Sequence, residues 1–491
     1  MAGKKILEKL WCIPVIVLVA NLIFRFINQS KMIYMFPLDV VNDWSAYIAL
    51  LNFLDKCGFH NFCPYWYDGF MSFVITQPGW YFFTYPIYLI SKNYTSASFI
   101  SMIIIFILSF LVVYNFADIF KIDKKKRILF YLLLFANAAS IGNYIRLGRV
   151  PEFFAFFLFI LTTFIILYYK DRQIDFIFTL IVPIYSLLLI SHQTFAILGS
   201  LLWISLFLVK RKKEITYIIL LIMTSLILVS FWLIPYISVF FNTVGVDKPI
   251  GINILSFDKE YLFETIFTFI IPMVFLFIFY LYIKKIKDYK KEILFYSPIL
   301  LISLLFLFRL TAFIPILNYI YPDVYMSFIL FFVLFLFFKN FKLNNNVLLM
   351  IILLSIFSVS INIFYTPFFV EHTQLEKDTL EIMSSVKTNF LMTNTYSKTS
   401  YGKAYYSYAP IYLNISTPSG WEKIPSPDYR NLIIKFSNSV YNKDCNLLYK
   451  SAKELKNDYI ISYREDCNFL ETCKYVNRIN KINNVCLYKF E

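Results

Sequence analysis

An aspartate directly before an amphipathic stretch is the first group in this chain whose position suggests chemistry. Asp43 precedes residues 44–54, whose apolar side chains recur at helical spacing, so we predict a helix lying in the head-group layer of a membrane. A carboxylate there can act as a general base toward an acceptor hydroxyl or amide. An aspartate before a helix also serves as an N-cap, and both interpretations stand. Asp39 and Asp68 are weaker candidates, because a loop carboxylate is solvated by default.

Four charged side chains and a histidine lie at the ends of other apolar stretches. Arg146, Arg149 and Glu152 can together hold phosphate oxygens and a metal or sugar hydroxyl, or form an interfacial salt bridge with snorkelling arginines. His192 lies in a tight turn, where it either pairs with a phosphate, orients a carboxylate, or is bonded to backbone. Arg309 interrupts apolar sequence, and an intramembrane arginine normally faces a partner or cavity. We expect a lipid phosphate as that partner.

The familiar motifs of soluble enzymes are absent from the sequence. It contains no P-loop, no G-x-G-x-x-G, no H-E-x-x-H and no G-x-S-x-G. Its three histidines are too few and too scattered for a dedicated metal cluster.

The elements that position these residues are long apolar runs separated by short basic loops. Hydrophobic residues make up 59% of the chain and charged residues 16%. Many runs reach the ~20 residues that a helix needs to cross a bilayer, and backbone amides in hydrocarbon must be satisfied within their own segment. The net charge of +15 lies mostly in the basic loops, as the positive-inside bias requires. We therefore predict a polytopic α-helical membrane protein whose partners are membrane lipids and not nucleic acid.

The runs predict about eleven transmembrane helices. Their ranges are 11–28, 98–117, 127–142, 153–169, 175–191, 193–209, 215–240, 262–283, 293–308, 324–338 and 345–365. Basic residues near the N-terminus place that end in the cytoplasm. The predicted domains are then a membrane domain at 1–365, with a first outer loop at 29–97, and an extracytoplasmic domain at 366–491.

Cysteine placement agrees with this topology. Only Cys12 of the seven cysteines falls in a predicted span. The others lie in even groups on the predicted outer side, which suits disulfides in an oxidising compartment, although six reduced thiols are the alternative. The four C-terminal cysteines allow three pairings, and all three stand. The disulfide candidates are Cys57, Cys63, Cys445, Cys467, Cys473 and Cys486.

The C-terminal residues differ in pattern from the rest. Strands are predicted at 390–393, 432–436, 459–462 and 485–490, and helices at 375–387 and 447–455. This mixture predicts a small α/β domain resting on the outer membrane surface.

The order of these features resembles the GT-C superfamily of membrane glycosyltransferases. It looks closest to the archaeal membrane proteins catalogued as 6-pyruvoyl-tetrahydropterin synthase-related. The resemblance rests on N-D-W at 42–44, C-P-Y-W-Y-D-G-F at 63–70, Q-P-G-W-Y at 77–81, G-R-V-P-E at 148–152 and L-F-R-L at 307–310. The chain departs from the oligosaccharyltransferase pattern in two places. The W-W-D acceptor motif is missing, since Trp421 stands in no such context, and an Asp39-x-x-x-Asp43 spacing replaces a tight acidic pair.

The resemblance implies an inverting transfer of a sugar from a polyprenyl-phosphate donor, on the outer membrane face. Asp43 would be the base, and Arg149 and Arg309 would neutralise the phosphate leaving group. Glu152 would contact the acceptor or a metal, with His192 assisting near the same pocket. The remaining candidates for substrate binding are Arg146, Asp39, Asp68 and Trp66.

Several assignments stay open at this stage. The acceptor is not identified, Mg²⁺ and Mn²⁺ are the candidate cofactors, and an archaeal source is expected. Two other functions fit the same sequence: a scaffold that kept the GT-C architecture without catalysis, and a lipid or solute transporter. Against the transporter, the sequence shows no internal repeat and no paired broken helices in matching halves.

Overall fold

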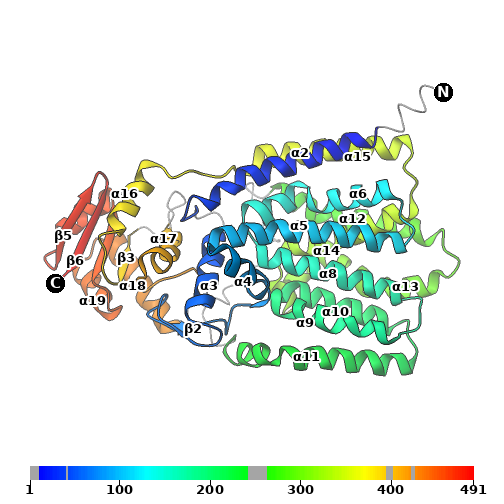
Figure 1. Cartoon of the computed structure of the whole chain (residues 1–491), viewed down its shortest axis with the longest axis horizontal. Helices are drawn as coiled ribbons and strands as arrows, with labels where there is room; N and C mark the ends of the chain where they lie inside the picture. Colours follow the sequence, from blue (N-terminus) through cyan, green and yellow to red (C-terminus); the bar gives the residue numbers. More distant parts are fainter. Residues whose placement is uncertain (1–9, 40–42, 241–261, 394–401, 422–425) are drawn as a thin grey trace.

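The computed structural model describes residues 10–39, 43–240, 262–393, 402–421 and 426–491. Long helices form one part of the elongated molecule, and a sheet with shorter helices forms its other end (Figure 1). The long helices are α2 (Cys12–Gln29), α5 (Tyr94–Ile119), α6 (Lys124–Phe135), α8 (Val150–Tyr169), α9 (Ile181–Ser191), α10 (Gln193–Phe207), α11 (Lys212–Phe240), α12 (Leu262–Ile283), α13 (Tyr289–Leu307), α14 (Pro322–Asn340) and α15 (Asn345–Tyr365).

Every stretch predicted to span the membrane is largely helical. Among the described residues, seven helices are long and apolar enough to cross a membrane, or up to eight if a bent helix pair counts as one span. The segments Phe176–Ser191 and Gln193–Phe207 are shorter apolar helices. The protein is therefore a multi-helix membrane protein, while the count of eleven spans, the sidedness and the domain boundaries stay predictions.

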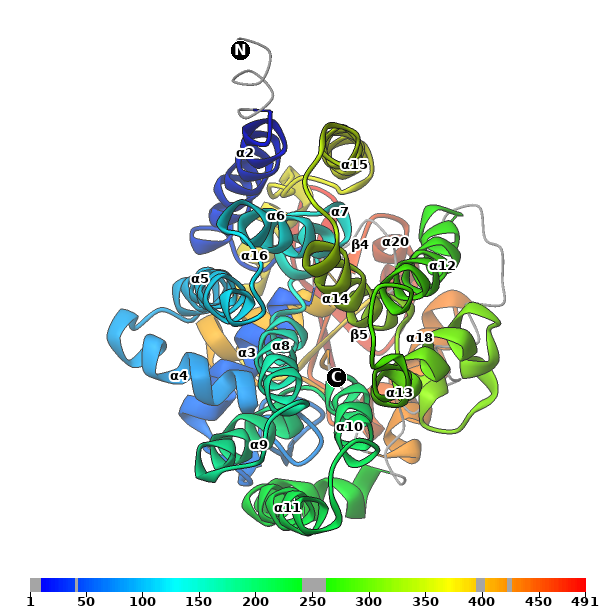
Figure 2. The ribbon, with the colours of Figure 1, turned by 90° about the vertical axis from the view of Figure 1, so that its right-hand side faces the viewer.

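Helix α8 lies at the centre of the bundle. It contacts α5, α9 and α10, and Figure 2 shows it ringed by other helices. In its most apolar window 89% of the residues are buried, against 28% for α11 and 22% for α15. Aromatic rings fill the space around it. The centre of the Phe159 ring lies 5.8 Å from that of Phe195 and 5.4 Å from that of Phe328. Most of the surface of helices α11 and α15 is therefore not covered by the other described residues.

The span predicted at 127–142 is broken, which corrects the prediction of one continuous helix. Helix α6 ends at Phe135, and α7 (Ala138–Ser140) and the π-helix η2 (Ile141–Arg146) follow at an angle of 50° to it. The side chain of Asn137 caps the second segment by accepting a hydrogen bond from the Ser140 backbone amide at 3.0 Å. A π-helical turn of this kind often marks a functional site.

The first outer loop contains helices and a short hairpin. Its elements are η1 (Ser30–Ile33), α3 (Trp44–Lys56), β1 (Phe62–Cys63), β2 (Phe70–Met71) and α4 (Gly79–Ser91). Helix α3 is buried within the protein, whereas its amphipathic pattern predicts one exposed face, and its position in the head-group layer stays a prediction. Trp44, Ile48 and Leu51 are fully buried, because α3 is covered by α17 of the C-terminal region as well as by the helix bundle.

The C-terminal region forms a four-stranded mixed sheet of order β3-β4-β6-β5. Strands β3 and β4 are parallel, and the other neighbours are antiparallel. The elements are α16 (Gln374–Met383), β3 (Phe390–Met392), α17 (Gly402–Tyr408), η8 (Ala409–Leu413), α18 (Pro427–Tyr441), α19 (Cys445–Glu454), β4 (Tyr459–Tyr463), α20 (Glu465–Glu471), β5 (Val476–Ile482) and β6 (Val485–Phe490). The smaller helical turns elsewhere are η3 (Phe176–Leu180), η6 (Leu310–Phe313) and η7 (Leu317–Tyr319).

The strand predicted at 432–436 is wrong, because these residues lie inside helix α18. Ser426 caps the helix by accepting a hydrogen bond from the Tyr429 amide at 3.2 Å, and a proline occupies the first turn. Ile433 and Phe436, three residues apart, then bury one face of the helix. Strand β5 and helices α17 and α20 were not predicted.

The six predicted disulfide cysteines are paired. Cys57 pairs with Cys63, with their Cα atoms 5.3 Å apart. In the C-terminal region Cys445 pairs with Cys473, and Cys467 with Cys486. The structure thus selects one of the three pairings that the sequence left open.

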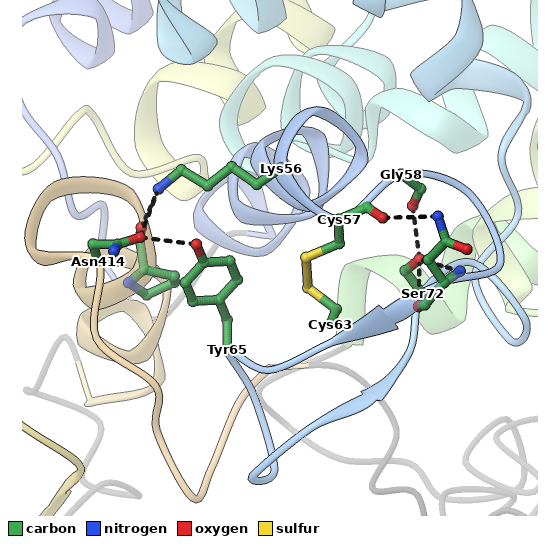
Figure 3. The surroundings of a disulfide bond; sticks show 9 residues. Lys56, Cys57, Gly58, Cys63, Tyr65, Ser72 and Asn414 are labelled. Atoms are coloured by element: carbon green, nitrogen blue, oxygen red, sulfur yellow. Dashed lines mark hydrogen bonds between the residues drawn. A yellow bond between two sulfur atoms is a disulfide. The ribbon is translucent and has the colours of Figure 1, made fainter.

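The first outer loop is docked on the C-terminal region. Figure 3 shows Lys56 and Tyr65 on the same side of the Cys57–Cys63 disulfide, both directed at Asn414. The Tyr65 hydroxyl donates a hydrogen bond to Asn414 Oδ1 at 2.8 Å, and Lys56 Nζ donates to the same atom at 3.3 Å. Specific side-chain hydrogen bonds therefore join the two parts of the chain at this junction.

Candidate active site

The candidate active site is built where the start of α3 meets the turn before α8. The Asp43 amide donates a hydrogen bond to the Leu147 carbonyl at 2.8 Å. The indole of Trp44 donates to the Ile145 carbonyl at 3.0 Å. Gly148 has a φ of +73°, and a Cβ there would lie 2.3 Å from the Trp44 ring. The two segments therefore pack closely against each other. This packing holds Asp43 beside Arg149, the residue that follows Gly148.

Arg149 is surrounded by carboxylates. Its guanidinium forms an ion pair with Asp323, in the first turn of α14, and lies 5.0 Å from the centre of the Tyr321 ring. Burial lowers the pKa of Arg149, but the charges of Asp323, Glu152 and Asp43 outweigh that effect and raise it above its ordinary value. One permanent cation thus holds three acidic side chains together.

Asp43 is a buried carboxylate with partners from two parts of the chain. Burial raises its pKa, while Arg149, a hydrogen bond with the Trp421 side chain and the charge of Lys403 act to lower it. Asp43 occupies the N-cap position of α3, yet its side chain makes no capping hydrogen bond. The capping interpretation therefore does not account for this carboxylate, and a proton-accepting role stays available.

Glu152 and His192 lie next to each other on the inner side of the same cluster. Glu152 is in the first turn of α8 and only 4% exposed. His192 Nε2 lies 4.0 Å from Glu152 Oε2, and His192 Nδ1 is bonded to Thr194 Oγ1 at 2.7 Å. Burial and the charge of Arg149 lower the pKa of His192 to about 4, so the ring is neutral at neutral pH. His192 can orient the Glu152 carboxylate there, and a contact with a phosphate stays a prediction.

Arg309 differs from Arg149 in its surroundings. It has a left-handed backbone conformation with φ of 64° and is 9% exposed. One nitrogen donates a hydrogen bond to Thr268 Oγ1 at 2.6 Å, and the guanidinium lies 3.9 Å from the centre of the Phe269 ring. Burial lowers its pKa to about 10, so the charge persists at neutral pH. Within the described residues no carboxylate pairs with Arg309, and its Nη1 has no hydrogen-bond partner.

Arg146 and Asp39 form a second ion pair a short way along the same two segments. Arg146 Nη2 lies 2.6 Å from Asp39 Oδ2, and both residues are buried. Arg146 also donates to the Pro367 carbonyl at 3.2 Å. Through these contacts Arg146 and Asp39 hold together the first outer loop, the turn before α8 and the chain that follows α15.

Trp66 and Asp68 lie at the contact with the C-terminal region. Trp66 is fully buried, and its indole donates to the Tyr406 carbonyl at 2.8 Å. Asp68 accepts hydrogen bonds from Tyr429 at 3.2 Å and from Asn389 at 3.3 Å. Packing accounts for both residues, and a contact of either one with substrate stays a prediction.

Sequence reasoning missed three members of the cluster. Asp323 follows a proline at the start of an apolar run, so a survey of carboxylates at helix ends could have found it. Trp421 was weighed only against an acceptor motif that it does not match. Lys403 carries no local signal, because only the fold of the C-terminal region brings it to Asp43.

The acidic side chains supply the oxygen ligands that Mg²⁺ or Mn²⁺ prefers. Within the described residues, however, no three aspartate, glutamate, histidine or cysteine side chains converge as a metal site. Asp323 instead forms an ion pair with Arg149, and its Oδ2 accepts a hydrogen bond from Asn143 Nδ2 at 2.8 Å. We therefore assign no step to a metal ion, and a metal requirement stays a prediction.

The chain was compared with known families, curated proteins and solved structures. No known family and no curated protein matches the sequence. The oligosaccharyltransferase of Archaeoglobus fulgidus, solved in complex with Zn and sulfate, matches with a TM-score of 0.60 at 12% identity, over 97% of this chain and 72% of that one. The arabinofuranosyltransferase AftD from Mycobacteria matches with a TM-score of 0.61 at 11% identity, over 97% of this chain and 40% of that one. This protein shares its overall fold with these two sugar transferases.

Proposed function

We propose that the protein is a glycosyltransferase that moves a sugar from a polyprenyl-phosphate donor to an acceptor on the predicted outer membrane face. The observation that carries the proposal is the buried Asp43 carboxylate, held between Arg149 and Trp421 at the junction of the membrane helices and the C-terminal region. A structure of the Archaeoglobus fulgidus enzyme with 13% identity contains an inhibitory peptide and a dolichol-phosphate, which supports a lipid-linked donor here.

In this proposal Asp43 takes the proton from an acceptor hydroxyl or amide. The acceptor atom then forms a bond to C1 of the sugar, on the face opposite the phosphate, while the bond between C1 and the phosphate oxygen breaks. The electron pair of that bond leaves with the polyprenyl phosphate, and the configuration at C1 is inverted.

The two arginines have different tasks. Arg309 is the cation available to the departing phosphate, because its charge is buried and no carboxylate of the described residues neutralises it. Arg149 is occupied by carboxylates and holds Asp43 in place. This division replaces the expectation that both arginines bind the phosphate.

The test is the turnover of labelled polyprenyl-phosphate sugars by the purified protein in lipid, with membrane extract as the source of acceptors. Asp43→Asn removes the base without changing its size, and we expect a fall in rate of about 10²–10⁴-fold. Asp118→Asn is the matched control, because Asp118 is exposed and its one ion pair among the described residues is with Arg127, at 2.9 Å. Parallel reactions with Mg²⁺, Mn²⁺ and a chelator test the metal requirement.

Each contrary result has a distinct meaning. Full activity of Asp43→Asn would remove Asp43 as the base. If the unaltered protein consumes none of the donor lipids, the scaffold becomes the better proposal. Movement of lipid or solute across vesicles without sugar transfer would favour the transporter.

A further inference from the structure

A groove lined by lysines lies at the end of the helix bundle remote from the sheet. It has a volume of about 410 Å³ and lies between the start of α6 and the connection from α14 to α15. In Figure 1 this end of the bundle faces away from the C-terminal region. Its lining residues are Asp123, Lys124, Lys125, Lys126, Lys342 and Leu343.

Most of the positive charge in this groove is uncompensated. Lys126 is largely buried, lies 3.6 Å from Asp123 and donates to the Phe338 carbonyl at 3.2 Å. Lys124, Lys125 and Lys342 are exposed, and no carboxylate of the described residues pairs with them. In the other basic connections some lysines are paired, since Lys210 lies 3.2 Å from Glu214 and Lys291 lies 2.7 Å from Asp171.

The backbone adds to the positive potential of the groove. Helix α6 starts at Lys124, and the preceding Asp123 makes no side-chain capping hydrogen bond. The amides of the first turn and the helix dipole therefore act in the same sense as the lysine charges.

The groove also has an apolar side. Leu343 lines it, and Lys125 Nζ lies 5.3 Å from the centre of the Trp11 ring, just before α2. Tryptophan is enriched at membrane–water interfaces, where lipid head groups lie. The adjoining helices α2 and α15 are mostly unburied in their apolar windows, at 33% and 22% buried.

We propose that this groove binds the phosphate of an anionic phospholipid head group, with the acyl chains lying along the exposed sides of α2 and α15. Positive charge on a loop follows from membrane topology alone. Membrane topology alone does not require three unpaired lysines to surround one groove. It also does not place a helix start and an exposed apolar surface beside them. The site is independent of the proposed sugar transfer.

The test is native mass spectrometry of the full chain released from detergent micelles, titrated with dioctanoyl phosphatidylglycerol. Dioctanoyl phosphatidylcholine and inorganic phosphate are the comparison ligands. The variant is Lys124→Gln/Lys125→Gln/Lys342→Gln, which leaves the buried Lys126 intact. The matched control is Lys284→Gln/Lys287→Gln/Lys290→Gln, three exposed lysines of another basic connection. Equal melting temperatures of the variants would show that all are folded.

We expect one phosphatidylglycerol to bind preferentially, and the groove variant to weaken this binding by about a hundredfold, while the control leaves it unchanged. Equal binding of phosphatidylcholine would overturn the proposal, as would full binding by the groove variant. Displacement of the lipid by inorganic phosphate at a similar concentration would assign the groove to free anions and also overturn it.

Discussion

At the scale of single residues, the site is decided by how each buried charge is paired. An unpaired ion in a low-dielectric interior is costly, so a buried carboxylate needs a cation or hydrogen-bond donors. Arg149 serves Asp323, Glu152 and Asp43 together, whereas Arg309 has no carboxylate partner within the described residues. These surroundings support the proposal that Arg149 holds Asp43 in place and that Arg309 is available to the departing phosphate.

The first prediction concerns the pH dependence of Asp43. Transfer requires the ionised carboxylate, so the rate falls as the pH drops through the pKa of Asp43. Lys403 acts to lower that pKa, and Lys403→Met therefore raises it. We expect the acidic limb of the pH–rate profile to move to higher pH, with the rate at the optimum less affected.

Lys403→Arg keeps the positive charge and serves as the control for this prediction. It should leave the acidic limb near its original position. An unchanged limb in Lys403→Met would mean that Lys403 does not act on the base.

At the scale of elements, the turn between the π-helix η2 and α8 positions the cluster. Gly148 adopts a φ of +73°, and the fully buried Trp44 leaves no room for a side chain there. The Arg149 amide donates to the Asn143 carbonyl at 3.0 Å, which fixes the chain that follows the turn. The turn thus sets the distance between Asp43 on one segment and Arg149 on the other.

The second prediction is that Gly148→Ala destabilises the protein. Its Cβ would lie 2.3 Å from a ring that cannot move away, and the backbone conformation disfavours a side chain. We expect a loss of roughly 1–3 kcal/mol in stability, measured as a lower melting temperature, together with reduced activity.

Gly142→Ala is the comparison for Gly148→Ala. A Cβ at Gly142 would meet its nearest atom at 3.7 Å, an ordinary contact, so little change is expected. Equal melting temperatures for the two variants would contradict the role given to the Gly148 turn.

At the scale of the whole molecule, the C-terminal region is fastened to the helix bundle at several points. Arg25 and Arg146 both donate to the Pro367 carbonyl, at 3.3 and 3.2 Å, just after α15. Asp68 meets Tyr429 and Asn389 at the other side of the junction. Because Trp421 and Lys403 reach Asp43 from this region, the junction is part of the candidate site.

The third prediction is that Tyr429→Phe loosens this junction. The hydroxyl donates toward Asp68 at 3.2 Å and the Pro418 carbonyl at 2.8 Å, and removing it leaves the half-buried Asp68 with one fewer donor. We expect the docking to weaken by about 1–3 kcal/mol. Faster hydrogen exchange at residues 66–69 and 417–421 would report it, along with a slower transfer.

Exchange in helix α6, which carries no residue of the junction or of the candidate site, provides the internal reference for Tyr429→Phe. Uniformly faster exchange throughout the chain would point to global destabilisation and not to the junction. Unchanged exchange at residues 66–69 would mean that Tyr429 does not hold the two parts together.

The sequence by itself determined the membrane character, the positions of the long helices and the cysteines that pair. Hydrophobic runs of bilayer length and their basic connections are local properties, and the structure has a helix at each of them. Asp43, Arg149 and Glu152, three of the candidates that the sequence offers, lie close enough for both carboxylates to raise the pKa of Arg149, while their roles stay predictions.

Only the tertiary structure decided which charges meet. Asp323, Lys403 and Trp421 join Asp43 and Arg149 from distant parts of the chain, and no local pattern encodes such a contact. The same holds for α3, whose amphipathic pattern predicts a surface helix but which is buried once the C-terminal region covers it. Pairing of buried charges depends on positions in space, and a sequence pattern reports only neighbours along the chain.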